Sequence, residues 1–129
     1  MAERGLAPGL RYFPDHFDRA AQEALVAAIR HVVAEAPLFV PRMPRTGKPM
    51  SVRMTNCGPL GWVSDVSGYR YQPIHPETGE PWPAMPRLAL DAWEALSGYL
   101  APPDACLINF YESAARMGLH QDKDEEEFD

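Results

Sequence analysis

The sequence lacks most features that mark secreted, membrane-spanning or phosphate-loop proteins. It holds only two cysteines, Cys57 and Cys106, too few for a disulfide framework or a cysteine zinc site. No apolar run approaches the roughly 18 residues of a membrane span, and no basic and apolar leader marks a secretory signal. Glycine-rich phosphate loops and a serine nucleophile elbow are also missing. These absences predict a reduced, cytoplasmic protein and exclude several common enzyme classes.

The composition is that of one soluble domain. Of the 129 residues, 46% are hydrophobic and 23% are charged, which is ordinary for a globular protein. The 14 prolines are about twice the average usage. Because proline fixes its own φ and restricts the residue before it, the proline clusters predict ordered loops between regular elements.

Charge is distributed unevenly along the chain. The formal net charge is −6, yet residues 122–129 hold six acids and one lysine, so the rest of the chain is nearly neutral. Residues 40–56 contain no acid and four basic side chains, namely Arg42, Arg45, Lys48 and Arg53. Such a basic strip can hold phosphates even on an acidic protein, although a solvated loop explains it equally well.

Two helices are predicted from apolar spacing of three and four residues. The first covers residues 17–33, with Asp15 or Asp18 able to cap its start and Pro37 preventing its continuation. The second covers about 86–100. Its apolar face comprises Leu88, Ala92, Leu96 and Tyr99.

Strands are predicted over residues 51–55, 68–71 and 105–111. In the second of these, period-two alternation points Tyr69 and Tyr71 the same way. In the third we expect a buried strand, with polar groups on an apolar face that cost about 1–3 kcal/mol each if unpaired. One face holds Leu107, Asn109 and Tyr111, and the other holds Cys106, Ile108 and Phe110. Two interpretations follow: an internally paired core, or a wall for a small polar ligand.

His120 and Asp122 are the sharpest candidates for metal binding. In an extended segment, residues two apart point the same way, so this imidazole and carboxylate converge. They would supply two of the three ligands in the facial triad of non-haem iron oxygenases. A surface histidine beside an acid is the simpler alternative. A zinc hydrolase using His120, Asp122 and His75 is a third, although His75 lies in a proline-rich loop and is predicted to be a turn residue.

Aromatic side chains gather in residues 54–82, close to Arg53 and Arg70. Aromatics interleaved with basic residues suit stacking on nucleobases with contacts to phosphates. A proline-braced aromatic core is the alternative. The group comprises Met54, Trp62, Tyr69, Tyr71 and Trp82.

Five stretches together resemble the AlkB family of Fe(II)/2-oxoglutarate-dependent dioxygenases, in its bacterial DNA-repair branch. They are residues 50–62, 68–71, 81–86, 103–111 and 119–125, in the family's order and with similar spacing. The resemblance implies an α+β fold that forms the N-terminal part of a double-stranded β-helix, or jelly-roll, with two supporting helices. It implies an incomplete single domain over 1–129.

The resemblance divides this domain into two regions. A nucleotide-recognition lid is expected over residues 37–86, and the first core strands with the metal motif over 104–125. In the second region, His120 and Asp122 are implied to be catalytic iron(II) ligands. Asn109 and Tyr111 are implied to contact 2-oxoglutarate.

The resemblance also implies substrate-binding roles. Trp62 would stack on a flipped-out damaged base, Met54 would form part of the base-pocket wall, and Asp124 would lie near the base. A carboxylate there favours the cationic bases 1-methyladenine and 3-methylcytosine over neutral bases. The residues implied to place the nearby phosphates are Thr55, Tyr69 and Tyr71.

The implied activity is oxidative demethylation of N-alkylated bases in DNA or RNA, with release of formaldehyde and succinate. The substrate would be single-stranded or locally opened, and the full-length enzyme a cytoplasmic monomer with no membrane partner. No histidine follows His120 and no arginine follows Arg116. The third iron ligand and the arginine for 2-oxoglutarate are therefore absent, and this chain is expected to be inactive alone. A non-catalytic nucleic-acid-binding remnant of the fold is the alternative.

Overall fold

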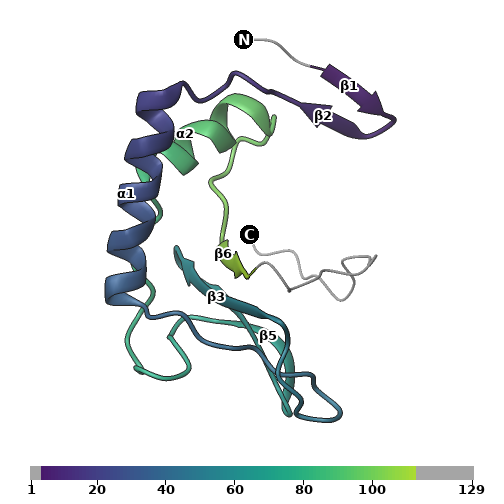
Figure 1. Ribbon diagram of the computed structural model, residues 1–129, viewed down its shortest axis with the longest axis vertical. Coiled ribbons are helices and arrows are strands. Elements are labelled where there is room, and N and C mark those ends of the chain that lie inside the picture. The colour runs from purple at the N-terminus through teal and green to yellow at the C-terminus, as the bar shows by residue number, and fades with distance from the viewer. Residues whose placement is uncertain (1–3, 113–129) are drawn as a thin grey trace.

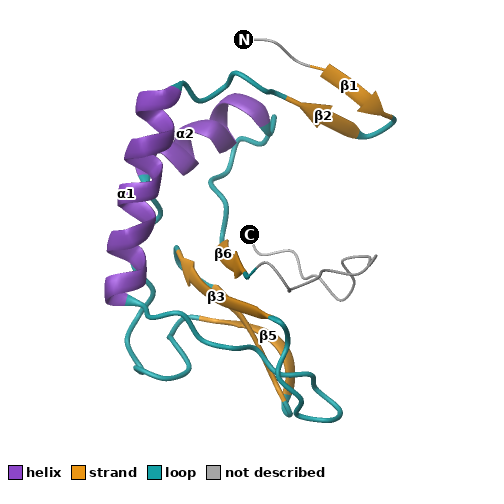
Figure 2. Ribbon diagram, viewed as in Figure 1, coloured by secondary structure: helices purple, strands orange, loops and turns teal. Residues whose placement is uncertain are grey.

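The computed structural model describes residues 4–112 of the chain, and within them helices and strands are mixed, as an α+β fold requires (Figures 1 and 2). In chain order the elements are β1 (Arg4–Ala7), β2 (Leu10–Tyr12), α1 (Arg19–Glu35), β3 (Val52–Cys57), β4 (Gly61–Asp65), β5 (Gly68–Gln72), α2 (Arg87–Leu96) and β6 (Cys106–Tyr111). The two helices lie side by side, and the β1–β2 hairpin extends away from them in Figure 1.

Helix α1 confirms the first predicted helix and one of its two candidate caps. The Asp18 carboxylate accepts a hydrogen bond of 2.8 Å from the Ala21 backbone N–H, which satisfies one of the free donors of the first turn. The helix ends at Glu35, and its C-cap, Ala36, lies directly before Pro37. Val32 on its inner face is buried, so the apolar spacing marks the packed side of the helix.

Helix α2 is shorter than the predicted span of 86–100. It begins after Pro86 and ends at Leu96, where Ser97 caps it and Gly98 takes a left-handed φ of 75°. Tyr99 therefore lies beyond the helix, and its ring lies 5.9 Å from that of Trp93. No helix within residues 4–112 is long and apolar enough to cross a bilayer.

The strands form three antiparallel pairs: β1 with β2, β3 with β6, and β4 with β5. The predicted strands correspond to β3, β5 and β6, although β3 continues through Cys57. The sequence did not predict β4, because both of its faces are largely covered and its residues do not alternate between polar and apolar. The short β1 and β2 were not predicted either.

A hydrophobic core at the C-terminal end of α1 supports the hairpin formed by β4 and β5. The indole of Trp82 is buried and donates a 2.8 Å hydrogen bond to the Gln72 carbonyl. It also lies directly over Gly61, where any Cβ would collide with the ring. The core residues are Ala36, Phe39, Met54, Val63 and Trp82. For Trp82 and Met54 the interpretation as core residues is therefore confirmed.

Candidate functional site

Three of the predicted substrate-binding side chains meet on one face of the β4–β5 hairpin. Trp62 is paired across the strands with Tyr71, and Ser64 with Tyr69. The rings of Trp62 and Tyr69 are stacked, with centroids 5.6 Å apart and planes 27° from parallel. Tyr69 is 54% exposed. The register confirms that the two tyrosines face the same way, and it builds an accessible aromatic surface.

Asn56 holds the backbone of Trp62 and was not identified from the sequence. Its side chain is fully buried. Its Nδ2 donates to the Trp62 carbonyl at 3.0 Å, and its Oδ1 accepts from the Trp62 N–H at 2.9 Å. Both polar groups of the tryptophan backbone are thus fixed by one amide. An asparagine within a strand carries no sequence signal for a contact made six residues away.

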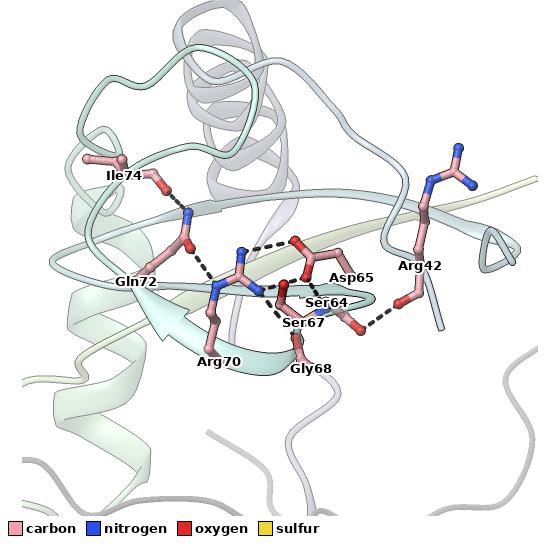
Figure 3. Close-up of polar contacts among 8 residues, drawn as sticks. All are labelled: Arg42, Ser64, Asp65, Ser67, Gly68, Arg70, Gln72 and Ile74. Atoms are coloured by element: carbon pink, nitrogen blue, oxygen red, sulfur yellow. Dashed lines mark hydrogen bonds and ion pairs between the residues drawn. The ribbon is translucent and has the colours of Figure 1, made fainter. Parts of the chain in front are cut away.

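Arg70 does not extend the aromatic surface with a free positive charge. Figure 3 shows its guanidinium in a two-point ion pair with Asp65, at 2.9 and 3.0 Å, while Nε donates to Gln72 Oε1 at 2.9 Å. The hydrogen bond from Arg70 is the main cause that lowers the pKa of the Asp65 carboxyl, and the Ser67 N–H adds to it. Arg70 was expected to contact phosphates, but its guanidinium is instead paired with Asp65 within the hairpin.

A hollow of about 430 Å³ lies beside Tyr69. Its lining consists of Met43, Pro44, Arg45, Thr46, Gly68 and Tyr69. The hollow therefore brings one member of the basic strip, Arg45, next to the aromatic surface. Arg42 instead donates to the Gly47 carbonyl of its own loop at 2.9 Å. The Arg53 Cζ lies 4.9 Å from the centroid of the Phe110 ring. The basic side chains of residues 40–56 therefore do not form one continuous surface.

The predicted co-substrate residues lie on one face of β6. Asn109 is paired with Met54 and Tyr111 with Val52, so their side chains share a face of the β3–β6 sheet. The predicted alternation is confirmed, but the expectation of a buried strand is wrong because Asn109 and Tyr111 are both exposed. The internally paired core is thereby excluded within residues 4–112. An accessible polar face is what a wall for a small polar ligand requires.

Met54 and Thr55 are both buried, on opposite faces of β3. Met54 belongs to the core cluster against which Trp62 packs, a position from which it supports the aromatic surface. Thr55 is fully buried, is paired with Ile108, and has a hydroxyl without a hydrogen-bond partner among the described residues. A phosphate contact needs an accessible hydroxyl, so the structure does not place Thr55 where that role requires.

The predicted metal ligands His120 and Asp122, and the predicted base contact Asp124, lie outside residues 4–112. Within that range no group of three metal-binding side chains occurs. His75 has both ring nitrogens in use: Nε2 lies 2.7 Å from the Pro37 carbonyl, and Nδ1 accepts from the N–H groups of Glu77 and Thr78. No lone pair is left for zinc, so the turn-residue prediction for His75 is confirmed and its role in a zinc site is wrong.

Comparison with known families identifies the class of protein. The family model described as the 2OG-Fe(II) oxygenase superfamily matches residues 9–129. The chain belongs to this superfamily, whose members have a jelly-roll fold.

Bacterial relatives confirm the resemblance to AlkB. The chain is 52% identical over 120 residues to the "Alpha-ketoglutarate-dependent dioxygenase AlkB homolog" of Caulobacter vibrioides (strain NA1000 / CB15N), covering 93% of this chain and 54% of that protein. It is 47% identical over 109 residues to the "Alpha-ketoglutarate-dependent dioxygenase AlkB" of Escherichia coli (strain K12), covering 81% and 50%. The chain thus spans about half the length of the curated bacterial relatives that it matches.

Proposed function

We propose that this chain carries the base-recognition surface and part of the co-substrate site of an enzyme that demethylates N-alkylated bases in DNA or RNA. The main support is the stack of Trp62 and Tyr69. The buried Asn56 side chain holds the backbone of Trp62 through two hydrogen bonds. Aromatic surfaces bind unpaired bases through their π-faces, and a neighbouring cation adds attraction to the backbone. Arg45 in the adjacent hollow supplies that cation.

The positions of the aromatic side chains support recognition of a damaged base. Extruding a base costs less when damage has already weakened its pairing, and Trp62 offers the ring on which it stacks. Tyr69 and Tyr71 contact the flanking phosphates through their hydroxyls, and Arg45 adds charge. Asp124 discriminates in favour of the cations 1-methyladenine and 3-methylcytosine, because a carboxylate stabilises a positive ring over a neutral one.

The co-substrate face suits a small dicarboxylate. The Asn109 amide and the Tyr111 hydroxyl are hydrogen-bond donors on an accessible strand face, so they can hold 2-oxoglutarate. His120 and Asp122 are the residues that would hold Fe(II). When bound, iron and 2-oxoglutarate would allow O₂ to hydroxylate the N-methyl group while 2-oxoglutarate is oxidised to succinate and CO₂, and the methyl carbon would then be lost as formaldehyde. We place the enzyme in the cytoplasm and expect the whole protein to be a monomer.

Binding of a labelled single-stranded oligonucleotide to the 129-residue chain tests the recognition surface. Fluorescence anisotropy would compare strands with one 1-methyladenine, strands with adenine, and the RNA equivalents. Since base stacking on an aromatic side chain contributes about 1–3 kcal/mol, Trp62→Ala should weaken binding of the methylated strand roughly 5- to 150-fold. Circular dichroism of each variant establishes that the fold is retained.

Two exposed tyrosines provide a matched control. Tyr69→Ala removes a ring from the stack, whereas Tyr99→Ala removes a more exposed ring beyond α2. Only the first should weaken binding. Equal affinity of the Trp62→Ala variant and the original chain for the methylated strand would contradict the proposal.

A further inference from the structure

The two cysteines lie directly opposite one another in the β3–β6 ladder. Cys57 is paired with Cys106, and both are free thiols. Residues directly opposite in antiparallel strands have Cα atoms about 4.5–5.5 Å apart, within the range that a disulfide spans. The Cys57 sulfur also lies 3.8 Å from the Cys106 carbonyl oxygen. The fold therefore brings together residues 49 positions apart in the chain.

The two thiols have different surroundings. Cys57 is fully buried in a cluster with Val32 and Met85, while Cys106 is partly exposed beside it. A hydrogen bond from the Cys57 thiol lowers the pKa of Cys106 to about 7. The same bond, together with burial, raises the pKa of Cys57. A partly exposed thiol with a lowered pKa next to a buried second thiol is typical of cysteine pairs that respond to oxidants.

We propose that Cys57 and Cys106 form a reversible intramolecular disulfide when the protein meets a peroxide. The Cys106 thiolate attacks the peroxide, the O–O bond breaks, and Cys106 becomes a sulfenic acid as the peroxide is reduced to water or an alcohol. The Cys57 sulfur then attacks the Cys106 sulfur, the S–O bond breaks, and water leaves with the proton of Cys57. A reducing thiol reverses the reaction.

The bond would form away from the co-substrate face. Cys57 and Cys106 share a sheet face with Thr55 and Ile108, whereas Asn109 points to the other side. The disulfide would tie β3 to β6 and restrict the unfolded chain. Oxidation should therefore raise the thermal stability of the chain without occupying the proposed ligand positions.

Mass spectrometry of the reduced 129-residue chain after treatment with hydrogen peroxide tests the proposal. We expect a monomer that has lost two hydrogens, one peptide pair joined through Cys57 and Cys106, a higher melting temperature, and full reversal by dithiothreitol. In Cys57→Ser, dimedone should trap a sulfenic acid on Cys106. In Cys106→Ser, the buried Cys57 should react much more slowly.

The same reaction in urea shows whether the fold brings the two cysteines together or whether they meet by random motion of the unfolded chain. In the folded chain, disulfide formation should be at least tenfold faster than in the unfolded chain. Equal rates with and without urea would overturn the proposal. So would disulfides only between chains, or oxidation of each cysteine to sulfinic acid without pairing.

Discussion

At the scale of single residues, the position of Trp62 depends on one buried amide. Asn56 uses both ends of its side chain on the Trp62 backbone, and it has no contact with solvent. A buried polar group whose partner is removed costs free energy, since water cannot replace the lost bond. Asn56 is therefore a positioning residue for the aromatic surface, although it lies beneath that surface.

Asn56→Ala should lower both stability and binding. Because it leaves the N–H and the carbonyl of Trp62 without their partners, the free energy of unfolding should fall by about 1–3 kcal/mol in urea titrations. Affinity for the methylated strand should fall as well. Asn109→Ala, on the neighbouring strand but exposed, is the stability control and should change unfolding by less than about 0.5 kcal/mol. An unchanged urea midpoint for Asn56→Ala would contradict this prediction.

Thr55→Val should be tolerated. The Thr55 hydroxyl is buried without a partner among the described residues, and valine has nearly the same shape and favours a strand. Removing an unsatisfied hydroxyl should leave stability unchanged or raise it by about 1 kcal/mol. Affinity for the oligonucleotide should stay the same. A marked loss of affinity in the anisotropy assay would restore the predicted phosphate contact.

The pair of Asp65 and Arg70 should give the protein a measurable acid sensitivity. Arg70 holds the pKa of Asp65 below its ordinary value of 3.8, so the folded state favours the ionised carboxylate. The pair therefore stabilises the fold fully above about pH 4, and this stabilisation is lost as the pH falls through the lowered pKa. Both side chains are about two fifths exposed, so the effect should be about 1 kcal/mol or less.

Comparing the original chain with Asp65→Asn measures this effect. Asp65→Asn should be less stable at pH 7, and the difference between the two chains should shrink as the pH falls below 4. Glu23→Gln is a suitable control, because it interrupts a more exposed ion pair within α1. A difference between the original chain and Asp65→Asn that stays constant with pH would rule out the ion pair as its cause.

At the scale of elements, the helices and strands that were predicted correctly are those with the clearest periodic spacing of apolar residues. Helix α1 was predictable because its apolar spacing, its Asp18 cap and Pro37 all agree. Helix α2 was predicted too long because Gly98 ends it before the apolar pattern ends. Strand β4 was missed because residues covered on both faces show no alternation.

Gly61→Ala tests the packing of β4 on the core. A Cβ at Gly61 would collide with the buried indole of Trp82, which is held by its bond to Gln72. We expect a loss of about 1–3 kcal/mol in the free energy of unfolding. Gly79→Ala is the control: its φ of 74° makes alanine unfavourable, but its surroundings are open, so its cost should be about 1 kcal/mol. A smaller loss for Gly61→Ala than for Gly79→Ala would contradict the packing argument.

At the scale of the whole molecule, the direction of the two tyrosines of the aromatic surface was predictable from the sequence, but the surroundings of the candidate site were not. Tyr69 and Tyr71 face the same way as expected because strand periodicity fixes their direction, whereas Trp62 meets them through the pairing of β4 with β5, which was not predicted. The pairing of Arg70 with Asp65 and the hidden position of Thr55 could not be predicted. Both depend on tertiary contacts, which a local pattern of residues does not contain.

Salt should weaken nucleic-acid binding, despite the net charge of −6. Binding through phosphates releases counterions, with a slope of about −0.7 per phosphate for single strands in a plot of log affinity against log salt. Arg45→Ala should make the slope shallower by about one such contact. Arg87→Ala is the control, since Arg87 is paired with Asp91 on α2. Equal slopes for the Arg45→Ala and Arg87→Ala variants would show that Arg45 touches no phosphate.

Strand β3 gives the two halves of the candidate site a shared backbone. Asn56 holds the residue on which we propose a base stacks, and Met54, two positions before it, is paired with Asn109, which we propose contacts the co-substrate. A shift of β3 on binding one ligand would therefore be felt at the other position. The two binding affinities are then linked. If 2-oxoglutarate raises the affinity for a methylated base by some factor, the base must raise the affinity for 2-oxoglutarate by the same factor, through slower dissociation or faster association.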